Sequence, residues 1–255
     1  MDQFILSLIT GIFISAIAGY IGSLMITKRM ALVAGPLGHL ALPGVALALI
    51  YNFGIFFGAL ISIFIGAVFI WIFSLRAKIP IEALTAIVFA TGVAAGFLFL
   101  PLEHAEEALI GDITDVDLSD TILAMFLSTI IFLVIRKIYT KIVLSELSED
   151  LAKSIKVDVD KYNLIYLISI ALVAAMEVKI VGILLTAALV AIPAAASRNL
   201  SRNLKQYSFL SSVFGVISAI IGILLFRITG MPAGPLIIMV AFLLFLISTI
   251  FCKNR

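Results

Sequence analysis

Long apolar runs separated by short polar turns cover nearly the whole chain. Most runs are close to the roughly 20 residues that an α-helix needs to cross a bilayer. We count nine runs, at residues 4–26, 30–51, 54–75, 83–100, 119–138, 161–177, 180–197, 208–228 and 234–252. The pattern therefore predicts an all-α membrane protein, a bundle of about nine transmembrane helices.

The second run departs from a plain membrane helix. Its first two thirds, residues 30–44, read MALVAGPLGHLALPG and carry two prolines, three glycines and a histidine, His39. Prolines and glycines leave backbone groups unpaired, which a bilayer tolerates only where the helix packs in protein or lines a wet cavity. At helical rise, His39 lies roughly 14 Å from the Met30 end, near the bilayer midplane. An ionisable residue at that depth indicates a functional site, so the pattern favours a transport path at His39.

His39 has two interpretations. A neutral imidazole binds zinc, manganese or iron and relays protons. A structural histidine would instead bond a backbone carbonyl freed by Pro36 or Pro43. One histidine is not a tight metal site, because metals take several ligands, but a transport path requires only weak, transient binding. The residues leave both interpretations open.

Composition and charge fix the class and the topology. The chain is 63% hydrophobic and 13% charged over 255 residues, which predicts one membrane domain spanning residues 1–255. If the helices alternate with Lys28 and Arg29 inside, 15 of the 17 Lys and Arg residues lie on the inner side and only Lys179 and Arg227 outside. Inner loops carry such an excess, so we expect the N-terminus outside and the C-terminus inside. The basic residues thus line a membrane face and indicate no nucleic-acid partner.

Small residues four apart in the first run, Gly11, Ser15, Gly19 and Ser23, predict a face on which another helix packs closely. A tight turn at residues 177–179 is expected to join the sixth and seventh runs, with its two charged residues, Glu177 and Lys179, anchoring helix ends.

Two connections are long. The outer one, residues 101–120, is acidic, and at its start lie Glu103, His104, Glu106 and Glu107. These residues could draw cations toward a pore mouth. A surface that binds a partner, or a merely solvated loop, would have the same composition. The inner one, residues 139–160, has charges of alternating sign. It predicts a short amphipathic surface helix with an apolar stripe of Leu144, Leu147, Leu151 and Ile155.

The sequence contains no catalytic apparatus that we can identify. It lacks the Gly-x-x-x-x-Gly-Lys-Ser/Thr loop that cradles ATP phosphates and the His-Glu-x-x-His zinc motif. The one cysteine, Cys252, excludes an intrachain disulfide and a cysteine metal cage. We therefore expect a transport subunit rather than an enzyme.

Three further motifs lie in order along the chain: MALVAGPLGHLALPGVALAL at residues 30–49, EALTAIVFATGVAAGFLF at 82–99 and VGILLTAALVAIPAAASRNLSRNL at 181–204. Together they resemble the permease subunits of zinc, manganese and iron ABC importers. In those proteins the second span carries a histidine followed by Leu-Pro-Gly, and the fourth begins with an acid, here Glu82. A weaker match is MPAGPLII at residues 231–238, and the resemblance spans nearly the whole chain.

The resemblance implies a fold similar to the cobalamin-type importers and a multi-pass protein of a prokaryotic cytoplasmic membrane. Two permease copies, here a homodimer, would form the pore, with ATP bound by two cytoplasmic ATPase subunits. A binding protein outside the membrane would deliver the metal ion, which this chain would transport and not keep as a cofactor. Residues 193–204, with Pro193, Arg198 and Arg202, would carry the coupling helix that meets the ATPase.

The chain also departs from the family pattern. Many members have an aspartate four residues before the histidine and another before the late Pro-x-Gly, where this chain has Gly35 and Gly230. The metal is therefore left open, and a permease of the same fold for a metal chelate or an organic micronutrient is the alternative. A self-contained secondary transporter would show inverted repeats and paired intramembrane charges, and neither is evident. A structural subunit without transport would not need the broken second run.

Overall fold

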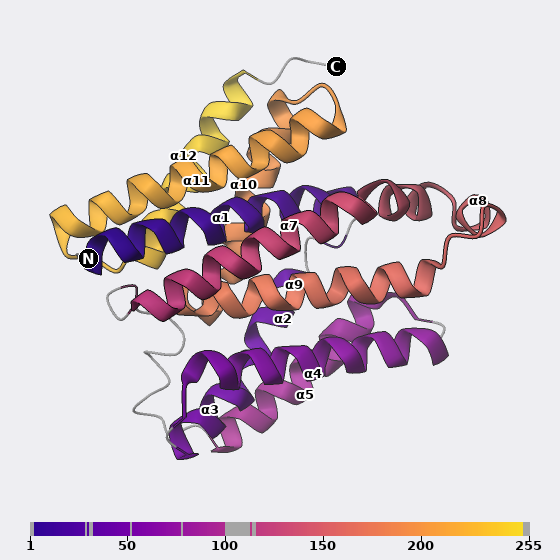
Figure 1. Ribbon diagram of the computed structural model, residues 1–255, viewed down its shortest axis with the longest axis horizontal. Helices are drawn as coiled ribbons and strands as arrows, with labels where there is room; N and C mark the ends of the chain where they lie inside the picture. The colour runs from indigo at the N-terminus through magenta and orange to yellow at the C-terminus, as the bar shows by residue number, and fades with distance from the viewer. Residues whose placement is uncertain are drawn as a thin grey trace.

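The computed structural model describes residues 3–28, 30, 33–51, 53–77, 79–99, 113 and 116–251. Every regular element among them is helical (Figure 1). In chain order these are α1 (Gln3–Thr27), α2 (Ala34–His39), α3 (Ala41–Tyr51), α4 (Ile55–Arg76), α5 (Ile81–Phe99), α7 (Leu118–Leu147), α8 (Glu149–Ser154), α9 (Val159–Val181), the 3₁₀ turn η3 (Ile183–Leu185), α10 (Thr186–Leu200), α11 (Leu204–Thr229) and α12 (Ala233–Ile250).

Eight of the described helices are long and apolar enough to cross a membrane, and a ninth, shorter apolar run covers Gly35–Tyr51. The predicted all-α bundle of about nine spans is therefore confirmed. The ninth run is the second in the chain, where the sequence predicted backbone breakers. The chain is thus a multi-pass membrane protein.

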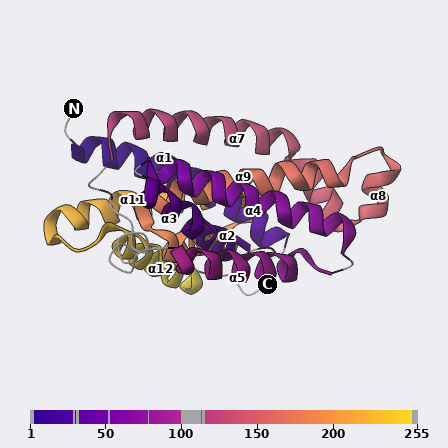
Figure 2. The same cartoon turned by 90° about the horizontal axis from the view of Figure 1, so that it is seen from below.

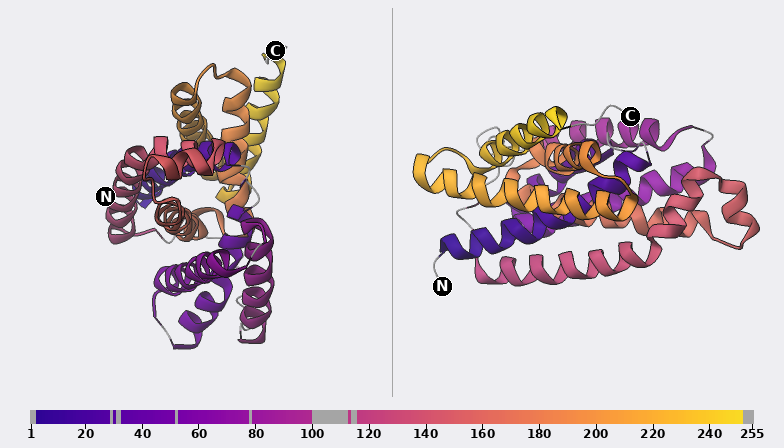
Figure 3. Two further views of the ribbon diagram at one scale, coloured as in Figure 1. Left: turned by 90° about the vertical axis from the view of Figure 1, so that its right-hand side faces the viewer. Right: turned by 90° about the horizontal axis from the view of Figure 1, so that it is seen from above.

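The long helices lie side by side with α8 at one end of the bundle, far from the start of α1 (Figures 1 and 2). Seen from that end, α3, α4 and α5 form one group and α1, α7 and α9 to α12 form another (Figure 3, left). The short helix α2 lies between the groups and packs against α4, α5, α9 and α10. The broken second run is therefore central in the bundle.

The small residues of the first run form the closest helix pairing, because α1 packs most extensively on α11. At Gly19 a side chain would overlap the backbone carbonyl of Ser211, so only glycine allows this approach. The Oγ atoms of Ser23 and Ser208 hydrogen-bond at 2.9 Å. The predicted packing face is confirmed. Gly11, Ser15, Gly19 and Ser23 meet, in order, Ile223, Gly215, Ser211 and Ser208.

The inner connection differs from its prediction. Helix α7 continues from its apolar part to Leu147, and only the six-residue α8 follows it. Leu147 and Leu151 are exposed, by 78% and 52%, while Ile142 and Ala152 are buried instead. The apolar residues of the predicted stripe are therefore divided between two helices, Leu144 and Leu147 on α7 and Leu151 on α8, instead of lying on one short helix.

The connection between the sixth and seventh spans also differs. Helix α9 continues through residues 177–179 and ends at Gly182, whose φ of 83° is in the left-handed region that favours glycine. Glu177 is therefore not in a turn; its side chain is fully buried inside the bundle. The expectation that Glu177 anchors a helix end is wrong.

Candidate functional site

A break in the second span defines the candidate site. Helix α2 ends at His39, Leu40 forms a turn, and α3 begins at Ala41. Pro43 lies in the first turn of α3, where its missing N–H costs no helical bond. It also cannot donate to the carbonyl of His39, four residues earlier. Pro43 therefore favours a break between two short helices next to His39.

Protein surrounds this break on several sides. A side chain at Gly38 would meet Thr186 at the start of α10, and one at Gly35 would lie 3.2 Å from the Ala187 Cβ. Leu40 is 3% exposed and its side chain packs against glycines of α4 and α5. The broken helix is thus packed in protein, which is the condition under which a bilayer tolerates it.

His39 is held by its own helix. Its Nδ1 atom lies 2.9 Å from the carbonyl oxygen of Gly35, and a carbonyl only accepts, so Nδ1 carries the proton. A neutral imidazole then keeps a lone pair on Nε2, which is the usual arrangement of a metal-binding histidine. The ring also meets Phe89 of α5 edge to face, with centroids 5.4 Å apart. His39 is half-buried, so one nitrogen has a structural bond and the other stays available.

The structure does not bring a set of ligands around His39. Among the described residues, no three His, Cys, Asp or Glu side chains lie close enough to hold a metal ion. Gly35 provides only its backbone, and Gly230 ends α11 with a φ of 70°, a left-handed cap that glycine favours. Within the part of the chain that the structure describes, one copy therefore offers a single imidazole at this site.

Glu103, His104, Glu106 and Glu107 fall outside the described residues.

The predicted coupling segment has a different shape from the one expected. Residues 193–204 do not form a separate surface helix, because α10 continues through the buried Pro193 to Leu200. Arg198 is exposed in its last turn, and Arg202 lies in the short link to α11, where its backbone N–H donates to Gln206 Oε1 at 2.9 Å. The two arginines thus lie at the end of the bundle where α11 begins.

The sequence analysis missed the burial of two ionisable residues, Glu177 and Lys28. Both carboxylate oxygens of Glu177 lack a hydrogen-bond partner among the described residues. Lys28, which follows α1, is only 9% exposed; its Nζ donates to Asn163 Oδ1 at 2.8 Å and lies 5.5 Å above the Tyr166 ring. Burial lowers the pKa of Lys28, and the charge of Glu146 opposes this. The signal for Glu177 was a charge inside an otherwise continuous apolar stretch.

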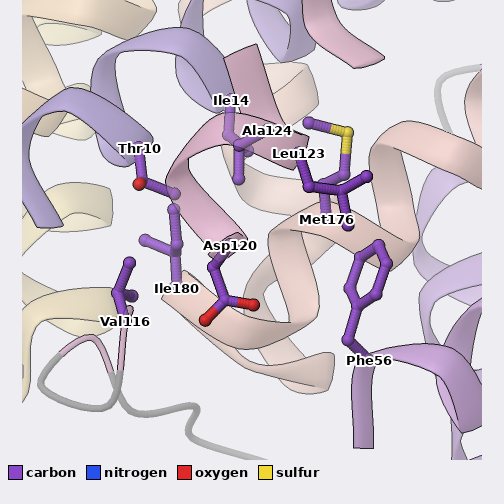
Figure 4. Close-up of a pocket in the computed structure, with 9 residues that line it drawn as sticks. All are labelled: Thr10, Ile14, Phe56, Val116, Asp120, Leu123, Ala124, Met176 and Ile180. Carbon is purple, nitrogen blue, oxygen red and sulfur yellow. The ribbon is translucent and has the colours of Figure 1, made fainter. Parts of the chain in front are cut away.

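A small cavity lies where α7 begins, beside α1 and α9 (Figure 4). Its volume of about 20 Å³ holds about one water. Asp120 supplies the only carboxylate among the lining residues, and it also forms a reciprocal cap with Asp117, whose Oδ1 accepts from the Asp120 N–H at 2.8 Å. The size and the apolar lining of the cavity suit a helix cap with one bound water better than a cation site.

Comparison with known proteins identifies the family. The family described as the ABC 3 transport family matches residues 1–252. The chain belongs to this family.

Relatives of this ABC 3 transport family member are named as metal transport proteins. The manganese transport system membrane protein MntC of Listeria monocytogenes is 26% identical over 253 residues, covering 98% of this chain and 90% of the relative. The high-affinity zinc uptake system membrane protein ZnuB of Buchnera aphidicola is 25% identical over 249 residues, covering 95% of each. Each of these relatives aligns along nearly its whole length, so the similarity is not confined to one motif.

A solved structure has the same fold. PsaBC from Streptococcus pneumoniae in complex with Fab is similar, with a TM-score of 0.84 and 27% identity, covering 97% of this chain and 91% of that chain. The resemblance seen in three sequence motifs thus extends to the whole architecture of this ABC 3 transport family member.

Proposed function

We propose that this chain is the permease subunit of an ATP-driven importer whose cargo is a divalent transition-metal ion, manganese or zinc. The observation that carries this is the half-buried imidazole of His39, which lies at a helix break inside the bundle with Nδ1 bonded to Gly35 and Nε2 available. Imidazole selects transition metals over calcium and magnesium, which prefer several oxygens. The names of the relatives, which include manganese and zinc systems, support this choice of cargo.

A second copy of the chain completes the path in this proposal. Helix α5, which carries the Phe89 ring against His39, exposes Ala86, Ala90 and Ala94 on one face. Small residues four apart let membrane helices approach closely. Packing of two copies through α5 would bring two His39 side chains to one axis, so that backbone carbonyls and water complete a weak ion site.

The remaining partners follow from the family. An ATPase would bind the end of the bundle that carries Arg198 and Arg202, and a binding protein would deliver the ion at the other end. Glu103, His104, Glu106 and Glu107 would draw cations toward the entry. Residues 1–255 act as one permease domain in the cytoplasmic membrane.

The orientation has its own test. The proposal requires the N-terminus outside and the C-terminus inside. Reporter fusions at the C-terminus and near Glu106 should therefore lie on opposite sides of the membrane. Two fusions on the same side would contradict this topology.

Uptake by the reconstituted complex tests the function. The permease, its ATPase and its binding protein are placed in lipid vesicles with ATP, and radiolabelled manganese, zinc and calcium are offered separately. ATP-dependent accumulation of manganese or zinc, without accumulation of calcium, is expected. If the vesicles accumulate a metal chelate but no free ion, the proposal of a free metal ion as cargo is contradicted.

A further inference from the structure

A groove of about 750 Å³ runs along the side of the bundle. Helix α1 forms its floor, and α7 and α11 form its walls; the right-hand view of Figure 3 shows α1 lying between them. From Ser128 to Thr140, the lining part of α7 rises about 18 Å at helical geometry, close to half of the ~30 Å hydrocarbon core. The groove therefore has about the depth of one leaflet.

Its two cations lie together at one end. Arg136 comes from α7 and Lys205 from the first turn of α11, both are exposed, and no acidic residue is among the described residues that line the groove. Near them, Ser208 Oγ, one turn after Lys205 on α11, lies 3.1 Å from the Tyr139 hydroxyl and joins the two walls. In the topology expected from the sequence, this end lies on the inner side of the membrane, with 15 of the 17 Lys and Arg residues. It therefore offers two positive charges and several hydroxyls to an anion.

The rest of the groove is largely apolar. Phe13 and Ile17 of α1 lie on its floor, and Phe132 and Phe209 come from the walls. The ring of Tyr20 meets Phe132 edge to face, with centroids 5.0 Å apart. Cationic groups at the membrane surface and aromatic groups below them follow the order of a phospholipid, headgroup first and acyl chain second.

We propose that this groove binds one anionic phospholipid of the inner leaflet. The lipid phosphate lies between Arg136 and Lys205, and one acyl chain runs along α1 toward Phe13. Basic pockets between transmembrane helices on the cytoplasmic side suit anionic headgroups. The groove is separate from the proposed ion path at His39. The lipid proposal therefore does not depend on which metal is the cargo.

Removing the two charges tests the headgroup contact. The assembled permease–ATPase complex is titrated with fluorescent phosphatidylglycerol in a phosphatidylcholine background. Each cation near an anionic lipid contributes about 1 kcal/mol, so the double variant Arg136→Ala, Lys205→Ala should bind phosphatidylglycerol roughly 30-fold more weakly. The matched control Lys137→Ala, Lys161→Ala removes two exposed charges outside the groove and should change binding less than about threefold. Fluorescent phosphatidylcholine should not distinguish the variants.

A second variant tests the acyl-chain contact. Ala16→Trp fills the floor and keeps both charges, so it should also release the anionic lipid. If the Ala16→Trp complex fails to assemble, the variant Arg136→Ala, Lys205→Ala tests the proposal alone, because both of those side chains are exposed. Equal phosphatidylglycerol binding by the charge variant and the wild type would overturn the proposal. So would a photo-crosslinker at Phe209 that traps a protein, a second copy of the chain included, instead of lipid in cells.

Discussion

The Nδ1 atom of His39 lies 2.9 Å from the carbonyl oxygen of Gly35, one turn earlier on α2. The backbone at residue 35 therefore orients the ring that, in our proposal, meets the ion. The family resemblance drawn from the sequence motifs implies an aspartate at this position in many members, where this chain has a glycine. The difference can be tested by restoring the acid.

Gly35→Asp should raise the preference for manganese over zinc by roughly tenfold, the effect of one added charged ligand. Residues four apart share a helix face, and carboxylate oxygen suits manganese. The new Cβ would lie 3.2 Å from Ala187 Cβ, which small adjustments accommodate. Competition between the two ions in vesicle uptake measures the shift. Gly35→Asn is the uncharged control, and an equal shift with asparagine would rule out the carboxylate as the cause.

Gly38→Ala should destabilise the packing of α2 on α10. Its Cβ would overlap the side chain of Thr186, and overpacking of this kind costs about 1–3 kcal/mol. Thermal unfolding of the purified complex measures the loss. Adding Thr186→Ala removes two of the three atoms in the way and should restore part of the stability. No recovery in the double variant would show that the strain arises elsewhere.

Glu177→Leu should stabilise the complex. Both carboxylate oxygens are buried without a partner among the described residues, and leaving such groups unpaired costs about 1–3 kcal/mol. Glu177→Gln keeps the shape but leaves an amide unpaired in the same place, so it should stabilise the complex less than Glu177→Leu does. Unfolding of the detergent-solubilised complex gives both values. A complex that fails to assemble with glutamine would reveal a charged partner for Glu177.

Arg198→Glu should uncouple ATP hydrolysis from uptake or weaken binding of the ATPase. Arg198 is exposed in the last turn of α10, and a transport gate needs such a contact to receive work. The ratio of ions transported to ATP hydrolysed should fall several-fold. Arg227→Glu, at the opposite end of the bundle, is the control and should leave the ratio unchanged. Normal coupling and assembly in Arg198→Glu would limit this arginine to anchoring the inner face.

Features that repeat along one helix could be predicted from the sequence. The apolar runs give the helices, and the four-residue spacing of Gly11, Ser15, Gly19 and Ser23 gives the face that α11 covers. Pro36, Pro43 and the glycines locate the break, because their backbone chemistry acts within a few residues.

Features that depend on a neighbouring helix could not be predicted. Glu177 resembles a turn residue in a hydropathy pattern, yet α9 ends only at Gly182, where the backbone becomes left-handed. Leu147 and Leu151 have helical spacing, but spacing does not say which face meets another helix. The bond from His39 went to the Gly35 carbonyl within its own helix and not to one freed by a proline. The Nε2 atom of His39 is therefore available to a ligand, which the sequence alone could not decide.

Uptake by the His39→Ala complex tests the account most directly. The complex should assemble with its ATPase as the wild type does, because the imidazole is half-buried and its hydrogen bond to Gly35 stays within its own helix. It should lose ATP-dependent uptake of manganese and zinc, while His39→Asp keeps some uptake and shifts its preference toward manganese. Wild-type metal uptake by an assembled His39→Ala complex would contradict the account and leave His39 a structural residue.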